Sequence, residues 1–251
     1  GISIVLLSIL SMLTSCEEQE DLNDPIPVLE SPAVSYIFTS DSNGKYDIWL
    51  YDDSTFTQLT TNNAKDSWWG RYSSASSKVL YYESNQGRNV NDYATASLMV
   101  MNADGTESKQ LLASGENGFE EQGLASWSHD GERIIFSAKD STEHWQLYIL
   151  ELGSGELNKV ETRVNQDYFD PIFNLDDESI FYVTSHNQSD NIQSYEIFEM
   201  DLNTNEEIRI TNNNTRDHHP VLTPNGNEIW FESLVDEDYL SIGQWQINKI
   251  D

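Results

Sequence analysis

The chain has 251 residues, of which 37% are hydrophobic and 11% aromatic, so it can bury a sizeable core and is not a disordered acidic chain. It carries 13 lysines and arginines against 43 aspartates and glutamates, a formal net charge of −30. A field of this sign repels nucleic-acid phosphates and anionic lipid headgroups, so we expect no nucleic-acid partner. Cations, basic peptides and neutral polymers remain open, as does the alternative that the charge serves solubility alone.

Residues 1–16 have the pattern of a lipoprotein signal peptide. The chain starts with Gly1 rather than Met, which indicates that the sequence begins inside its gene product, and residues 2–13 are apolar and uncharged. This run is too short for a membrane-spanning helix, which takes ~20 residues, and it fits the apolar region of a signal peptide. Leu13-Thr14-Ser15-Cys16 then resembles the lipobox of bacterial lipoproteins, in which the cysteine accepts a diacylglycerol. Cys16 is the only cysteine, so no intrachain disulfide is expected; the alternative is an incidental thiol.

Residues 17–31 predict an acidic tether, because they are rich in Asp and Glu and contain Pro25 and Pro27. An acidic stretch directly after an acylated cysteine resembles the export signal of surface lipoproteins in some Gram-negative bacteria; a plain spacer is the alternative. We expect a cell-envelope protein that faces the periplasm or the exterior and meets the membrane through its lipid anchor only.

Residues 32–251 contain an internal repeat. Four segments, 72–81, 127–136, 173–182 and 222–231, each join a large apolar residue, a polar turn and a β-branched or aromatic strand. Their first residues, Tyr72, Trp127, Phe173 and Leu222, lie 55, 46 and 49 residues apart. Asp130-Gly131 and Asn225-Gly226 in two of the turns are strong hairpin signals, because such turns need positive φ.

Each repeat continues with an alternating third strand and a short fourth strand. The third strands are expected at 46–51, 97–101, 146–150, 195–200 and 244–247, and fourth strands at 57–60 and 208–211. Four short antiparallel strands every ~45 residues are typical of a β-propeller blade. The sequence therefore predicts an all-β propeller with about five blades.

Three stretches resemble the WD40-like (PD40) repeat of TolB-type β-propellers: Trp127-Ser128-His129-Asp130-Gly131, Asn102-Ala103-Asp104-Gly105 and Leu59-Thr60. The resemblance covers nearly all of residues 32–251, although only Pro171 and Pro220 keep the first proline of the family pattern. It implies a six-bladed ring.

The sequence offers fewer strands than such a ring needs. The first blade has no clear first strand, for which Asp24-Pro25-Ile26 could stand because Asp170-Pro171-Ile172 opens the fourth blade, and the chain ends within the fifth. We expect part of a six-bladed ring; a five-bladed ring is the alternative.

In this family the loops that lead into each first strand gather near the mouth of the central channel. Acidic and aromatic residues recur there, with Glu120 and Glu121 in one such loop. Sugars, cations and basic peptides suit such residues. The alternative is that each Asp holds its own turn while the aromatics pack between blades. The candidate ligand-binding residues are Asp66, Trp68, Trp69, Asp167, Tyr168, Asp217, His218 and His219.

We expect no metal or other cofactor. Asp217-His218-His219 is the nearest pattern to a metal site, but neighbours on a strand point to opposite faces. Oligogalacturonate lyases are similar propellers that hold a metal with histidines from several blades, and no such set is matched by His129, His144 and His186.

The sequence contains no nucleophile elbow, and a propeller-bearing peptidase would need a hydrolase domain for which this chain has no room. We therefore expect a non-catalytic binding or scaffolding propeller for an envelope protein or glycan. The alternative is an enzyme, either like a polysaccharide lyase or as the propeller part of a prolyl-oligopeptidase-type peptidase.

Overall fold

The computed structural model describes residues 35–87, 92–185, 195–213, 215–234 and 245–250. Cys16, the signal peptide and the acidic tether lie outside the described residues, so these predictions stay open. The strands are β1 (Tyr36–Ser40), β2 (Asp47–Asp52), β3 (Thr55–Gln58), β4 (Lys65–Ser73), β5 (Lys78–Asn85), β6 (Ser97–Asn102), β7 (Lys109–Leu112), β8 (Glu121–Trp127), β9 (Arg133–Lys139), β10 (Trp145–Glu151), β11 (Leu157–Lys159), β12 (Tyr168–Phe173), β13 (Ser179–Ser185), β14 (Tyr195–Asp201), β15 (Glu207–Arg209), β16 (Asp217–Leu222), β17 (Ile229–Leu234) and β18 (Trp245–Ile250). A 3₁₀ turn, Glu116–Gly118, precedes β8.

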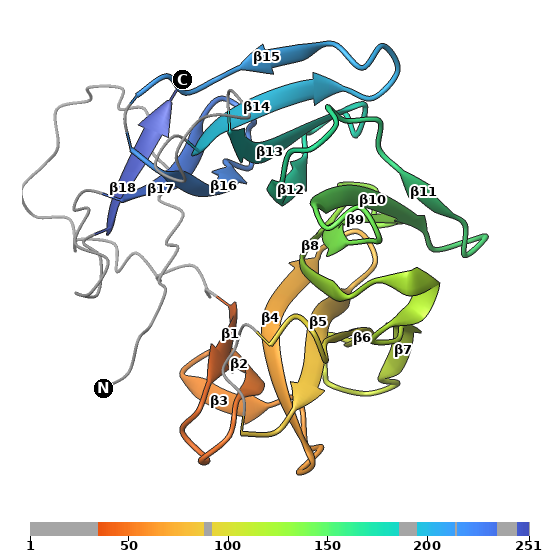
Figure 1. Cartoon of the computed structure of the whole chain (residues 1–251). Coiled ribbons are helices and arrows are strands. Elements are labelled where there is room, and N and C mark those ends of the chain that lie inside the picture. Colours follow the sequence, from red (N-terminus) through yellow and green to blue (C-terminus); the bar gives the residue numbers. More distant parts are fainter. Residues whose placement is uncertain (1–34, 88–91, 186–194, 214, 235–244, 251) are drawn as a thin grey trace, which may run out of the picture.

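The strands form five antiparallel sheets, which we call blades 1 to 5 in chain order. Within the described residues, blades 2, 3 and 4 have four strands each, and blade 1 (β1-β2-β3) and blade 5 (β16-β17-β18) have three. The blades follow one another in an arc from orange to blue (Figure 1). The innermost strands β4, β8, β12 and β16 pack each against the next. The prediction of an all-β propeller with about five blades is confirmed.

Each innermost strand contains a bulge at the same place. Trp69, Leu124, Asp170 and His219 take φ values of 62°, 60°, 51° and 50°, each where the register shifts against the second strand of the blade. Positive φ is uncommon for residues other than glycine, so four equivalent cases mark a feature of the repeat. A bulge re-aims the side chain that it carries.

The turns between the first and second strands follow the predicted chemistry. Ser128 donates its hydroxyl to Asp130 Oδ1 at 2.5 Å and accepts the backbone N–H of Arg133 at 2.9 Å. Gly131 in this turn has φ 74°, and Gly226 in the equivalent turn of blade 5 has φ 72°. The glycines supply the positive φ for which the Asp-Gly and Asn-Gly pairs were expected.

The four large apolar residues of the repeat lie at the ends of the innermost strands rather than at the starts of strands. They pair with the first or second residues of the second strands, Tyr72 with Val79, Trp127 with Ile134, Phe173 with Ile180 and Leu222 with Ile229.

A threonine two residues after the outermost strand of a blade (β3 or β15) ties the chain to the neighbouring strand of the same blade (β2 or β14). Thr60 donates its hydroxyl to buried Asp47 at 2.8 Å, and Thr211 donates to buried Glu196 at 2.6 Å. Each hydroxyl also accepts the backbone N–H of the residue after that acid, at 3.0 and 2.9 Å. The Leu-Thr ending of the repeat therefore has a structural role.

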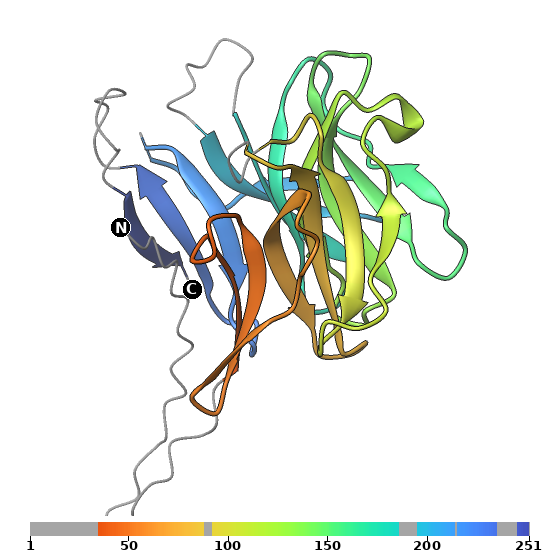
Figure 2. The same ribbon diagram turned by 90° about the horizontal axis from the view of Figure 1, so that it is seen from below.

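The core consists of apolar layers between neighbouring blades. Trp68, Tyr82 and Phe136 belong to the layer between blades 2 and 3, and Tyr168 and Tyr182 to the layer between blades 3 and 4. Further layers join blade 1 to blade 2 and blade 4 to blade 5. In Figure 2 the strands run roughly along the vertical, so the strand ends gather at two opposite faces. In the part of the chain that the structure describes, no helix is long and apolar enough to cross a membrane.

Candidate functional site

Trp69, His218 and His219 meet at the centre of the arc. The Trp69 ring, from blade 2, lies 5.7 Å from the His219 ring, from blade 5, and the His218 ring lies 6.0 Å from that of His219. Trp69 and His219 are both bulge residues of innermost strands. The bulges therefore bring side chains from distant parts of the sequence together.

Asp170, the bulge residue of blade 4, holds both histidines. Its Oδ2 lies 3.0 Å from His218 Nδ1 and accepts the backbone N–H of His219 at 3.2 Å. His219 Nε2 lies 3.5 Å from Asp170 Oδ1, and His219 Nδ1 lies 3.1 Å from Glu232 Oε2. The side chain of Asp170 is 4% exposed. We call Asp170, His218, His219 and Glu232 the central cluster.

The central cluster shifts the pKa values of its members. Desolvation raises the pKa of Asp170, but the charges of His219 and His218 outweigh it and lower the pKa to about 2. Desolvation lowers the pKa of His219, yet Asp170 and Glu232 outweigh it and raise that pKa above its ordinary value. The cluster therefore favours a charged Asp170 beside a more basic His219.

Arg71 adds a cation to the centre. Its guanidinium carbon lies 4.0 Å from the centroid of the Trp69 ring, a cation–π arrangement. The side chain keeps contact with solvent, yet the surrounding protein desolvates it and lowers its pKa to about 10, against the opposing effect of Asp170. This combination fits a side chain that projects into the middle of the arc.

Two polar atoms of the central cluster lack hydrogen bonds. Asp170 Oδ1 and His218 Nε2 are buried and make no hydrogen bond within the described residues. A buried polar atom without a partner costs about 1–3 kcal/mol. Asp170 Oδ1 keeps its ion-pair contact with His219 Nε2 at 3.5 Å. Both atoms retain hydrogen-bonding capacity that a water, or a polar group of a ligand after a side-chain movement, can use.

An aromatic collar continues from the central cluster across four blades. Successive rings lie 5.3–5.9 Å apart, most of them edge to face. The rings are half-buried except that of Trp245, which is 45% exposed. The collar consists of Tyr93, Trp145, Phe169, Tyr195, His218 and Trp245.

The predicted residues Trp68 and Tyr168 lie in the core between blades rather than at the centre. Trp68 stacks on Tyr82 at 5.1 Å and donates its indole N–H to Ser84 at 3.0 Å. Tyr168 is fully buried and lies 5.5 Å from the ring of Tyr182. Their positions correspond to the packing alternative.

Asp66 and Asp167 join neighbouring blades. Asp66 accepts the backbone N–H of Tyr46 at 3.1 Å, and Asp167 accepts that of Trp145 at 2.8 Å. Tyr46 directly precedes β2, and Trp145 is the first residue of β10. Each acid thus bonds to the start of the third strand of the preceding blade, so the two acids hold equivalent positions. Glu121 occupies this place in blade 3 and lies 3.9 Å from Lys139.

Asp217 lies one position later in the repeat than Asp66 and Asp167. Asp217 is paired across the sheet with Ser233. The equivalent cross-strand pairs are Ser67 with Glu83 in blade 2 and Tyr168 with Thr184 in blade 4. The carboxylate of Asp217 is fully buried and accepts hydrogen bonds from Ser233 at 2.5 Å and Asn213 at 2.7 Å.

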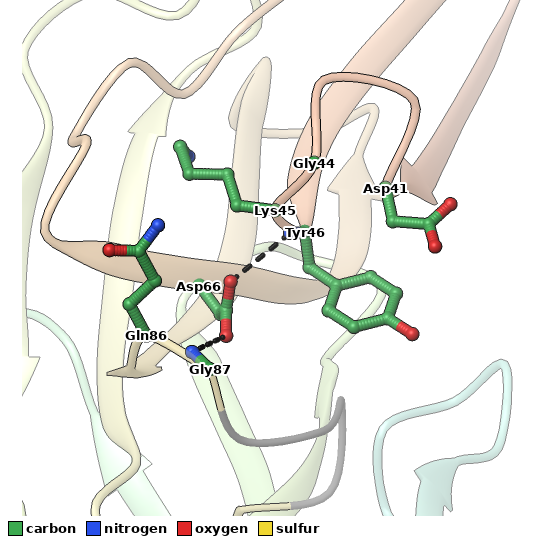
Figure 3. A pocket seen from close by; sticks show the side chains of 7 residues that line it. All are labelled: Asp41, Gly44, Lys45, Tyr46, Asp66, Gln86 and Gly87. Atoms are coloured by element: carbon green, nitrogen blue, oxygen red, sulfur yellow. Dashed lines mark hydrogen bonds between the residues drawn. The ribbon is translucent and has the colours of Figure 1, made fainter.

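A surface pocket of about 580 Å³ lies between blades 1 and 2. Figure 3 shows Asp66 in this pocket, bonded on one side to Tyr46 and on the other to Gly87. Both carboxylate oxygens are thus engaged by backbone N–H groups, and the ammonium group of Lys45 is bonded to Asp47. The central cluster and the collar combine charged groups with aromatic rings from several blades, so they are the better candidate site.

The comparisons with known proteins rest on solved structures, because no family model and no curated protein matches the chain. TolB from Acinetobacter baumannii superposes with a TM-score of 0.63 at 12% identity, over 85% of this chain and 49% of that one. A putative TolB from Agrobacterium tumefaciens gives 0.61 at 16% identity, over 88% of this chain and 78% of that one. The chain has the TolB-like propeller fold.

The TolB-like fold also occurs in enzymes. An oligogalacturonate lyase in complex with manganese superposes with a TM-score of 0.57 at 15% identity, over 81% of this chain and 57% of that one. At such identities the likeness concerns the fold alone. The chain spans about half the length of the Acinetobacter baumannii TolB.

The central cluster of this TolB-like fold consists of histidine–carboxylate contacts. Within the described ranges, no group of three or more His, Cys, Asp or Glu residues has the geometry of a metal site. In the same ranges the side-chain partners of His218 and His219 are the carboxylates of Asp170 and Glu232. A nucleophile–base pair would instead place a hydroxyl or thiol against a histidine.

Proposed function

We propose that the chain is a non-catalytic binding propeller of the bacterial cell envelope, anchored through a lipid on Cys16. The collar and the central cluster bind a neutral glycan or a basic segment of an envelope protein. The observation that carries the proposal is the run of half-buried rings beside two buried polar atoms without hydrogen bonds, Asp170 Oδ1 and His218 Nε2.

The chemistry of the site supports a ligand without net negative charge. Aromatic rings offer apolar faces to sugar C–H groups and electron-rich faces to cations. Asp170 and Glu232 accept hydrogen bonds, and the formal net charge of −30 repels acidic polymers. Hydroxyl groups of a glycan or ammonium groups of a peptide fit these acceptors.

Alanine at Trp145 or Trp245 is expected to weaken ligand binding at least tenfold, because each change removes one ring of the collar. Binding is measured by tryptophan fluorescence and calorimetry with two probes, a neutral xylo-oligosaccharide and a lysine-rich peptide. Polygalacturonate serves as the acidic probe, for which we expect no binding.

Tyr72→Ala is the matched control for these variants. Tyr72 is 51% exposed and lies at the other end of an innermost strand, so this change should leave binding intact. Equal binding by the collar variants and the original chain, or binding by neither neutral nor basic probe, would contradict the proposal.

Lipid attachment at Cys16 is expected from the order of the apolar run, the small residues and the lone cysteine. Cells fed a fatty-acid analogue should label the protein, and Cys16→Ser should abolish the label. Label that survives the substitution would refute lipid attachment at Cys16. It would not bear on the proposed ligand-binding site.

A further inference from the structure

Among the described strands, β1 forms an edge of blade 1 that has no partner strand. In the other blades an innermost strand covers the second strand, whereas in the described residues β1 is itself the edge of its sheet. All five residues of β1 are only half-buried, while β5, β9 and β13 are almost wholly buried. An edge strand exposes N–H and C=O groups that can pair with another strand.

The pairing of innermost and second strands follows one rule in the four other blades. The last pair before the bulge joins residues 14 positions apart: Trp68 with Tyr82, Gly123 with Ser137, Phe169 with Val183, and His218 with Glu232. The first pair after the bulge joins residues nine positions apart: Arg71 with Leu80, Ser126 with Ile135, Ile172 with Phe181, and Val221 with Trp230.

The hydrogen bonds of the third strands show which residues of β1 correspond to which residues of β9 and β13. The carbonyls of Ile48, Leu147 and Ile197 each accept the backbone N–H of the residue directly after the outermost strand (β3, β11 or β15), at 2.8, 2.9 and 2.8 Å. Opposite these three residues stand Thr39, Ser137 and Val183. Thr39 therefore holds the position of Ser137 and Val183, and Ile37 holds that of Ile135 and Phe181.

We infer that residues 24–29 form the innermost strand of blade 1 on the open edge of β1. Counting 14 positions back from Thr39 gives Pro25, and nine back from Ile37 gives Val28. Pro27 then falls on the position of Pro171 and Pro220, directly after the bulge residue.

The remaining positions match as well. Val28 falls where blades 4 and 5 have Ile172 and Val221, and Leu29 falls where they have Phe173 and Leu222. Proline suits the bulge, because its missing N–H costs no ladder hydrogen bond there. This register shortens the predicted tether to residues 17–23 and puts Pro27, not Pro25, in the place of Pro171.

A cysteine scan tests the register in the full chain carrying Cys16→Ser, so that the introduced thiols are the only ones. The matched pairs are Val28→Cys with Ile37→Cys, and Leu29→Cys with Tyr36→Cys. The swapped pairs, Val28→Cys with Tyr36→Cys and Leu29→Cys with Ile37→Cys, use the same four substitutions one residue out of register. Side chains one residue out of register point to opposite faces of the sheet, which disulfide geometry does not allow.

At least one matched pair should form an intrachain disulfide under mild oxidation, identified by mass spectrometry of the joined peptides, and both swapped pairs should stay reduced. Swapped pairs that close equally fast overturn the register. Disulfide-linked dimers mean that a second copy supplies the strand, and no disulfide in any pair means that residues 24–29 do not cover β1. Either result overturns the inference.

A second variant gives an independent measurement. Ile26 falls on the bulge position, where positive φ is unfavourable for a β-branched residue. Ile26→Asn should therefore raise the melting temperature by about 2–4 °C. An unchanged or lower melting temperature counts against the inference. Neither test depends on lipidation or on ligand binding.

Discussion

Replacing Trp127 by alanine is expected to lower the free energy of unfolding by about 3–5 kcal/mol. The side chain is 9% exposed in the layer between blades 2 and 3, and its indole N–H donates to the carbonyl of Arg71 at 2.9 Å. The substitution removes a large buried surface and leaves a cavity between two blades. Urea unfolding followed by circular dichroism measures the change.

Two further variants separate the causes of this loss. Trp127→Phe keeps most of the ring but loses the hydrogen bond, so we expect a smaller loss. Tyr72 holds the same repeat position in blade 2 but is 51% exposed, and Tyr72→Ala should change the free energy by roughly 0.5 kcal/mol at most. A loss below about 1 kcal/mol for Trp127→Ala would show that the blades do not pack through this residue.

Asp217→Ala should cost about 2–4 kcal/mol of stability and leave the affinity of the folded protein for its ligand unchanged. The buried carboxylate accepts hydrogen bonds from Ser233, Asn213 and Thr215, at 2.5, 2.7 and 3.1 Å. Without it, the buried hydroxyl of Ser233 and the two less buried donors lose their partner. Thermal melting and the two binding probes, applied to the same samples, measure both effects.

Asp217→Asn is the control, because the amide keeps the shape and one acceptor oxygen. It should lose less stability than the alanine variant. Full stability combined with lost binding in Asp217→Ala would return Asp217 to the ligand site.

The fold was predictable from the sequence because its signals are local. Asp130-Gly131 and Asn225-Gly226 specify tight turns whatever surrounds them, and the alternating third strands follow from burial of one face. The bulges were not predictable, because Trp69, Leu124 and His219 share no residue type that signals positive φ. Their conformation depends on packing around the centre.

The site was predictable only in part. Aligning the repeats by their acids equated Asp217 with Asp167, whereas the strand register aligns His219 with Asp170. Pro171 and Pro220, each one residue after a bulge, already carried the correct alignment. Arg71 and Glu232 could not have been found in this way, since they reach the centre from positions with no counterpart of the same chemistry in other blades.

The collar did leave a signal in the sequence. Trp145, Tyr195 and Trp245 each begin the third strand of a blade and precede a polar residue. Tyr168 stood equally close to the predicted loops, but strand alternation turns it into the core. Trp68 also lies in the core, although it holds the same register position as Phe169 and His218 of the collar. Which side of a strand faces the centre is set by the whole sheet rather than by neighbouring residues.

The direction of the innermost strands also orients the protein at a membrane. These strands start at the face that carries the collar, since Phe169 and His218 are the second residues of β12 and β16. A strand at residues 24–29 running the same way would enter the propeller at that face, and Asp24 follows Cys16 by only eight residues. Eight residues span about 28 Å at full extension, so the linker between Cys16 and Asp24 is no longer than the hydrocarbon core of a bilayer is thick. If Cys16 carries a lipid and residues 24–29 form this strand, the collar faces the membrane across a narrow gap. In that arrangement, partners embedded in or attached to the same membrane are favoured over partners that diffuse freely.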